Sequence, residues 1–317
     1  MMNKGAHFLL VIISFLLTFL SARAQCCSPG NPIGGLGNLG VLNEKSLKLI
    51  ANYDYSFSGT YMDGTRKVDP YFVRSGYFNH ARLNLGYGIR KKITVGIGTG
   101  YFFNKTQNYV EGIIPEKKTG YGFTNIDLIT KYNIFGKHGW EITSGVGLRF
   151  PLGPYNAVFK DVVSAMDIQP SSGAVDYIFS IFLYKEYPEN HLRFFMRSLF
   201  ELKTKNPLQY KYGNLWANSL FVSLNISPQW DMIVQLRNEI RQRDKRPAQS
   251  KPFQPEFISI SGSNKLFVTP QLSYSLNPDL VLSGLVSLPL FQKYNEQQLA
   301  NTVSVSVLLI KKLRLQN

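Results

Sequence analysis

The stretch KITVGIGTGYFF, residues 92–103, decides how the chain folds. Its odd positions run from Ile93 through Val95 to Phe103 and are mostly apolar, whereas its even positions are largely polar or glycine. Successive side chains of a β-strand point to opposite faces, so the pattern predicts an extended segment with one greasy face and one polar face. The segment exceeds the about five or six residues usual in soluble sheets and is long enough to cross a bilayer at a tilt.

The same unit recurs along the chain, and the links between its copies alternate between long and short. Outer-membrane barrels have short periplasmic turns and longer external loops, whereas no rule for a soluble sandwich demands this alternation. The sequence therefore predicts an all-β fold, a transmembrane antiparallel β-barrel of about 12 strands formed by residues 45–317. The expected strands are 45–57, 79–89, 92–103, 122–134, 140–152, 173–184, 191–203, 214–226, 230–241, 264–276, 280–291 and 301–313.

The first residues carry an export signal. A basic start, an apolar run over 8–20 and small residues up to Ala24 predict a cleaved signal peptide at 1–24, and with the barrel a location in the cell outer membrane. The two cysteines, Cys26 and Cys27, follow directly; Gln25 before them disfavours a lipoprotein site, and adjacent cysteines do not staple a fold. Residues 25–44 are rich in Gly, Pro and Asn and are expected either to plug the barrel or to hang in the periplasm.

The charge balance is strongly basic, with 35 Lys and Arg against 20 Asp and Glu and a net charge of +15. The mean hydropathy of −0.10 is too polar for a bundle of membrane helices. In a soluble protein such a charge favours nucleic acid, but here the basic residues are scattered at alternate positions rather than gathered in runs. We therefore expect no nucleic-acid partner and a charged lumen instead.

Alternation assigns a set of ionisable residues to the polar face. Rings of Arg or Lys favour anions, yet twelve strands enclose a narrow bore, so an open anion-selective path and a closed interior filled by paired charges both fit the pattern. The candidates for lining a transport path are Arg82, Arg149, Asp176, Arg193, Arg197, Glu201, Arg237, Glu239 and Arg241. The same face is expected to hold Asp54, Lys92, Asp127, Lys131, Glu141 and Asp231.

Catalysis has little support in the residues. Only His80, His138 and His191 remain after the signal peptide, and the last two fall at short turns. His80 has no His-x-Ser motif beside it, so the pattern of a barrel phospholipase is absent. We predict no enzyme, no metal site and no cofactor.

Two long loops are candidates for closing the barrel or for contacting molecules at its outer surface. Loop 153–172 is apolar enough to pack somewhere, and we expect it to form an inward constriction or a lid. Loop 242–263 is basic, which favours either a solvated loop or a contact with lipopolysaccharide. Outer-membrane lipid is the expected surrounding, and the sequence leaves the oligomeric state open.

Three short stretches carry a resemblance to a known family: QCCSPGNPIGG at 25–35, RFPLG at 149–153 and IQPSSGAVDY at 168–177. They resemble Bacteroidetes-type outer-membrane barrels of the phenol-degradation meta-pathway type, which are distantly similar to fatty-acid-transporter-like porins. The resemblance covers the whole mature chain. It implies a barrel and suggests passage of small, apolar molecules, without supplying binding residues.

The leading functional prediction is therefore passage of a small solute, apolar, aromatic or anionic, across the outer membrane. The alternative is a non-transporting barrel that binds a partner through its external loops or its N-terminal segment. Ion conduction in a planar bilayer separates the two.

Overall fold

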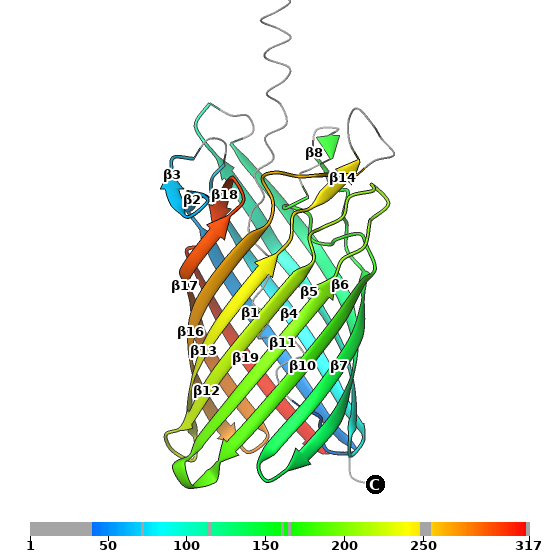
Figure 1. Cartoon of the computed structure of the whole chain (residues 1–317), viewed down its shortest axis with the longest axis vertical. Helices are drawn as coiled ribbons and strands as arrows, with labels where there is room; N and C mark the ends of the chain where they lie inside the picture. The colour runs from blue at the N-terminus through cyan, green and yellow to red at the C-terminus, as the bar shows by residue number, and fades with distance from the viewer. Residues whose placement is uncertain are drawn as a thin grey trace, which may run out of the picture.

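The chain forms a closed barrel of antiparallel strands, as the computed structural model shows for residues 40–70, 73–112, 116–159, 162–163, 166–247 and 255–314 (Figure 1). Strands that follow one another in sequence pair, and the first closes on the last from Ser46 opposite Arg314 to Phe57 opposite Val303. The barrel strands are β1 (Ser46–Ser58), β4 (Val73–Arg90), β5 (Ile93–Tyr109), β6 (Lys117–Lys137), β7 (Trp140–Pro151), β10 (Asp176–Tyr187), β11 (Leu192–Leu202), β12 (Leu215–Asn225), β13 (Trp230–Arg241), β16 (Ser263–Asn277), β17 (Leu280–Tyr294) and β19 (Val303–Arg314). The predicted fold is confirmed; the predicted signal peptide and both cysteines lie outside the described residues.

The two faces of the wall have the chemistry that the alternation predicts. On β19, Val305, Val307 and Leu309 are 41–48% exposed on the outside, while Ser306 between them is buried in the lumen. A soluble monomer rarely exposes an apolar patch larger than a few hundred Å², whereas here such side chains encircle the barrel. The outer surface is therefore suited to lipid, and the lumen holds the buried polar groups.

The strands extend beyond the predicted ends at the outer side. The prediction of an external loop at 104–121 was wrong, because β5 continues to Tyr109 and β6 begins at Lys117. Alternation of apolar residues stops where lipid stops, but backbone pairing continues above it. Further short strands lie at this end, in the sheet of β18 (Gln297–Ala300), β2 (Thr60–Asp63) and β3 (Arg66–Val68), and in the pairs β14 (Lys245–Pro247) with β15 (Pro255–Phe257) and β8 (Val158–Phe159) with β9 (Val162–Val163) (Figure 1).

Two residues depart from the pattern. Lys92, expected on the lumen face, is exposed in the turn between β4 and β5, because β5 begins only at Ile93. Phe102, an apolar residue at an even position of the stretch 92–103 where the pattern has polar residues or glycine, is 1% exposed and packs inside against His80. A register irregularity of β5 follows Phe102 directly.

The inner end has tight turns. His138 and His191 adopt φ of 53°, a left-handed conformation in which His is enriched among non-glycine residues. His191 ends a single 3-10 turn, Pro188–Asn190, between β10 and β11. Among the described residues, no helix is long and apolar enough to span a membrane.

The lumen is asymmetric. On β4, β5 and β7 many lumen-facing positions lack side chains, whereas the walls formed by β10 to β13 carry large ones. Glycines in register with lumen-facing residues make up what we call the glycine wall: Gly86, Gly88, Gly96, Gly98, Gly100, Gly145 and Gly147. The absence of side chains lets other groups approach this wall closely: a Cβ at Gly88 would lie 2.0 Å from the Asn43 carbonyl oxygen, and one at Gly145 would lie 2.5 Å from the Ser180 hydroxyl.

Candidate functional site: the charged lumen

All nine residues proposed to line a path lie on the lumen face. The register places Arg82 level with Asn52, Arg193 level with Ser223 and Arg241 level with Leu215, each of which faces inward. Asp176, Arg197, Glu201, Arg237 and Glu239 are 0–7% exposed. Whether they act on a solute stays a prediction.

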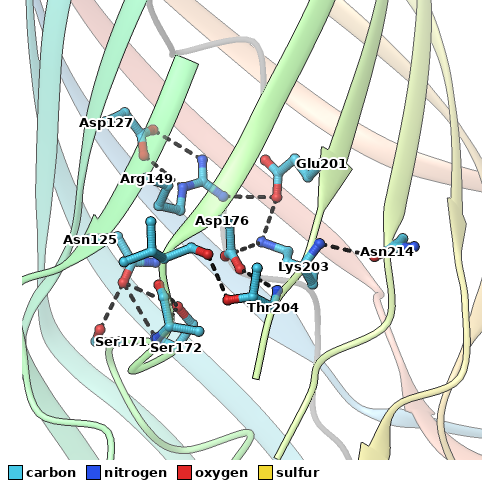
Figure 2. Close-up of polar contacts among 12 residues, drawn as sticks. Asn125, Asp127, Arg149, Ser171, Ser172, Asp176, Glu201, Lys203, Thr204 and Asn214 are labelled. Atoms are coloured by element: carbon cyan, nitrogen blue, oxygen red, sulfur yellow. Dashed lines mark hydrogen bonds and ion pairs between the residues drawn. The ribbon is translucent and has the colours of Figure 1, made fainter. Parts of the chain in front are cut away.

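The outer half of the lumen holds a network of five charges, the outer charge network, which consists of Asp127, Arg149, Asp176, Glu201 and Lys203 (Figure 2). Arg149 of β7 donates to both carboxylate oxygens of Asp127 on β6, at 2.6 and 3.0 Å, and to Glu201 on β11 at 2.8 Å. Lys203 lies 2.7 Å from Glu201 and 3.1 Å from Asp176. The network bridges the four neighbouring strands β6, β7, β10 and β11. It braces the wall that carries two of the resemblance motifs, 149–153 and 168–177.

The sequence missed Lys203. It lies in the predicted strand 191–203 on the same parity as Arg197 and Glu201, so alternation alone was the signal. Its backbone N–H donates to the Asn214 side chain at 2.9 Å, and the next residue, Thr204, donates to Asp176 at 3.1 Å. These bonds hold the start of the 203–214 loop over the outer charge network.

The described part of loop 153–172 folds inward, in agreement with the predicted constriction. Residues 166–171 are buried. Lys105 of β5 donates to the Gln169 carbonyl at 3.2 Å, and Asn125 of β6 accepts from Ser171 at 2.7 Å. A Cβ at Gly120 would lie 2.2 Å from the Ile168 carbonyl oxygen, so glycine there admits the loop. The side chains of 158–165 lie outside the described residues.

The outer loops are joined by a second hub. Asp244 is fully buried and accepts from the Tyr210 hydroxyl at 2.5 Å and from the Gly213 N–H at 2.7 Å. Tyr212 donates to the Met166 carbonyl at 2.9 Å, which links this hub to the inward loop. Burial, and then the nearby Asp244 carboxylate, raise the pKa of Tyr210 well above its ordinary value, so that it remains a donor. The outer mouth is thus covered by interlocked loops.

A file of basic side chains runs along the lumen from this covered end toward the periplasm. Arg197 interacts electrostatically with Glu201 and then, more weakly, with Arg82 and Arg237. Lys131 interacts with Arg197, and Lys48 interacts with Lys131. Lys312, the register partner of Lys48, ends the file at the inner mouth. We call Arg237, Arg197, Lys131, Lys48 and Lys312 the cation file.

Lumen carboxylates pair with several cations, among them Arg237 of the cation file. Glu239 contacts Arg237 at 3.2 Å and Lys265 at 3.5 Å, and Asp231 pairs with Arg193. Cross-strand pairing, one of the two outcomes that the pattern allowed, is therefore present at the outer end and beside Arg193. It coexists with the row of like charges in the cation file.

His80 is not arranged as a catalytic base. Its Nδ1 lies 3.5 Å from Asp54, which also accepts from Ser306 at 2.5 Å, so the carboxylate lies between the hydroxyl and the imidazole. A Ser-His pair needs the imidazole on the hydroxyl itself. The space around the other ring nitrogen is closed by the backbone at Gly100, where a Cβ would lie 2.3 Å from Nε2. Among the described residues, no group of three His, Cys, Asp or Glu is placed to hold a metal.

Residues 40–44 lie at the periplasmic mouth of the lumen, against the inner ends of β4, β5 and β7. The Leu42 N–H donates to Thr94 of β5 at 2.7 Å, and the Val41 N–H donates to Glu141 of β7 at 3.2 Å. A Cβ at Gly88 of the glycine wall would lie 2.0 Å from the Asn43 carbonyl oxygen. We call residues 40–44 the floor strap; residues 25–39 lie outside the described part.

The fold and this lumen define an outer-membrane β-barrel with a charged interior. No protein-family model matches the sequence, and no curated protein matches it significantly. Among solved structures, an outer membrane channel from Pseudomonas putida F1 aligns with a TM-score of 0.64 at 10% identity, over 87% of this chain and 98% of that one. The NanC porin aligns at 0.49 with 13% identity over 83% and 100%, and a deltaS2 mutant of the TodX monoaromatic hydrocarbon channel at 0.48 with 9% over 93% and 96%.

At these identities the likeness shows the fold alone. The first alignment spans nearly the whole of both chains, so the barrel architecture is shared with a channel. The two looser alignments carry no further argument.

Proposed function

We propose that the protein lets small anionic solutes cross the outer membrane. The cation file carries the proposal, because it places basic side chains of β1, β6, β11 and β13 in succession from the outer half of the lumen to the periplasmic mouth. Like charges at close range in a weakly polar interior repel, and a mobile anion adds to the compensation that fixed carboxylates such as Glu239 provide. Basic rings in pores select anions for the same reason. The channel fold found in Pseudomonas putida F1 supports passage through such a barrel.

The test is the reversal potential of the mature protein in a planar bilayer under a tenfold KCl gradient. An ideally anion-selective path gives about 59 mV with the sign set by chloride. Lys48→Gln and Lys131→Gln should each move the potential toward zero. Lys67→Gln on β3, which removes the same charge at an exposed outer site, should leave it unchanged. Cation selectivity would refute the proposal, and a silent barrel would favour the non-transporting scaffold.

We also propose that residues 25–44 plug the barrel from the periplasmic side. The support comes from the floor strap, which lies against the inner ends of β4, β5 and β7 at Gly88, Thr94 and Glu141. Residues 25–39 precede it directly and are rich in Gly, Pro and Asn. At Gly88 the backbone of the strap lies so close to the wall that a Cβ would meet it.

A side chain at Gly88 should displace the strap. Gly88→Ala places a Cβ 2.0 Å from the Asn43 oxygen, whereas Gly284→Ala on β17 meets nothing within 4 Å and is the matched control. We expect larger and less interrupted single-channel currents for Gly88→Ala alone. Equal currents for the two variants would show that the strap does not limit flow.

The surrounding partners that we propose are outer-membrane lipid and lipopolysaccharide. Exposed Lys205 and Arg243 lie on the outer loops, at the level where lipopolysaccharide phosphates would lie. Replacing both with Gln should reduce the lipopolysaccharide that copurifies with the protein, and unchanged copurification would remove this partner. The kinship with the Bacteroidetes phenol-degradation-type barrels stays a prediction from short motifs.

A further inference from the structure

A group of aromatic side chains lies inside the barrel, on the wall formed by β10, β11 and β12. Phe182 and Tyr184 of β10, Phe195 of β11 and Phe221 of β12 all share the lumen face with Arg197. The ring of Phe195 lies 5.2 Å from Tyr184, 6.1 Å from Phe182 and 6.2 Å from Phe221, centroid to centroid. These separations suit edge and offset contacts between rings. We call the four rings the aromatic patch.

The aromatic patch is open to the lumen. Phe182 is buried, but Tyr184, Phe195 and Phe221 are only half-buried. An aromatic surface left open to water is unfavourable, at about 25 cal/mol per Å², and a ring stacked on it recovers that energy. The patch therefore offers a contact for a ring in the periplasmic half of the lumen.

A positive head adjoins the patch. Phe182 is the register partner of Arg197, and Phe195 lies two residues away on the same face of β11. Lys131 reaches toward the same place over Gly145, where its Cγ lies 3.6 Å from the position a Cβ would take. A guanidinium binds a carboxylate through two parallel hydrogen bonds, and an ammonium adds charge.

A hydrogen-bond acceptor completes the group. Gln235 of β13 is 2% exposed, is level with Phe221, and donates to Ser219, the register partner of Arg197, at 2.9 Å. Within the described structure its Oε1 accepts no hydrogen bond. Buried acceptors without a donor are rare in folded proteins, so this atom indicates a donor supplied by a ligand.

We infer that Arg197, Lys131, Gln235 and the aromatic patch form a binding site for small aromatic carboxylates, with preference for those that carry a hydroxyl. The carboxylate contacts Arg197 and Lys131, the ring lies on Phe195 and Phe221, and the hydroxyl donates to Gln235. The inference rests on the proposed anion passage and specifies the class of solute that binds in the lumen during passage. The ring lies on the faces of Phe195 and Phe221 that are only half-buried.

Titration calorimetry on the detergent-solubilised mature protein tests the site without requiring conduction. The probes are benzoate, 4-hydroxybenzoate, acetate and benzyl alcohol. We expect saturable binding of benzoate, tighter binding of 4-hydroxybenzoate, and at least about tenfold weaker binding of acetate and benzyl alcohol, since each lacks one of the two contacts. Benzoate that binds no better than acetate would overturn the inference.

Variants separate the site from the rest of the lumen. Phe195→Leu and Phe221→Leu should each weaken benzoate about two- to tenfold and leave acetate unchanged. Phe102→Leu, at a buried lumen ring away from the patch, is the control and should leave both unchanged. If Phe195→Leu and Phe102→Leu have the same effect, the assignment fails.

The two proposals fail separately. A barrel that conducts chloride but binds no benzoate keeps the proposed passage and loses this site. A barrel that is silent in bilayers but binds benzoate in the calorimeter keeps the site and loses the passage.

Discussion

Arg149 is the side chain whose loss should weaken the barrel most among the lumen charges. It makes two bonds to Asp127 and one to Glu201, with the three side chains only 14, 11 and 8% exposed. In Arg149→Gln, Glu201 keeps Lys203 at 2.7 Å, but Asp127 loses its guanidinium. Breaking a buried pair from one side destabilises by about 3–5 kcal/mol. The three side chains keep some exposure, and Glu201 keeps Lys203 as a partner. We therefore expect the free energy of unfolding to fall by an amount near the lower limit, about 3 kcal/mol.

Arg193→Gln is the matched control. Its pair with Asp231 is 30 and 23% exposed, and Asn225 also donates to Asp231, so the expected loss is no more than about 1 kcal/mol. Urea unfolding of both variants in lipid vesicles, followed by tryptophan fluorescence, measures the difference of about 2 kcal/mol. Adding Asp127→Asn to Arg149→Gln should recover part of the loss, because the stranded charge is removed. Equal losses for Arg149→Gln and Arg193→Gln, or no recovery in the double variant, would refute the reasoning.

Three further predictions concern the lipid face and the interlocked loops that cover the outer mouth, which we call the outer cap. Asp244→Asn should loosen the outer loops and speed their cleavage by external protease, because Tyr210 and Gly213 lose a charged acceptor worth about 1.5–3 kcal/mol; unchanged cleavage would contradict the hub. Because the pKa of Tyr210 is raised in the folded cap, its contribution to cap stability should be constant up to about pH 10 and fall above it, as the unfolded tyrosine loses its proton first. Tyr210→Phe should reduce that dependence in the same protease assay, and the part that remains is expected from Tyr212, whose pKa is raised by burial and by Asp244 as well. Val307→Arg, on the lipid face of β19, should destabilise the barrel by about 2–4 kcal/mol in the urea assay, and no loss would mean that Val307 does not face lipid.

The barrel strands were predictable because lipid and lumen impose period two on each of them. The segment 230–241 alternates except at Ile233 and Asn238, and β13 has those bounds. The same rule failed at 104–121, because above the membrane both faces are wet and pairing continues without apolar alternation.

The site was predictable only in part. Parity alone assigns Arg197 and Glu201 to the lumen, and the register confirms that face. Alternation also places Phe195 on the lumen face, but it does not predict a role for this side chain. A single phenylalanine among polar lumen residues is indistinguishable from a chance exception to the pattern. Contacts between segments distant in sequence, such as Val41 with Glu141 or Tyr210 with Asp244, have no local pattern and follow only from the closed barrel.

The most direct measurement places a reactive thiol in the cation file during conduction. With Cys26 and Cys27 replaced by Ser, Lys131→Cys is exposed to membrane-impermeant thiol reagents of opposite charge while single channels are recorded. We expect the anionic reagent to react faster than the cationic one, and each modification to lower the chloride current in a discrete step. A thiol that is labelled while the current stays unchanged would show that solutes do not pass along these side chains.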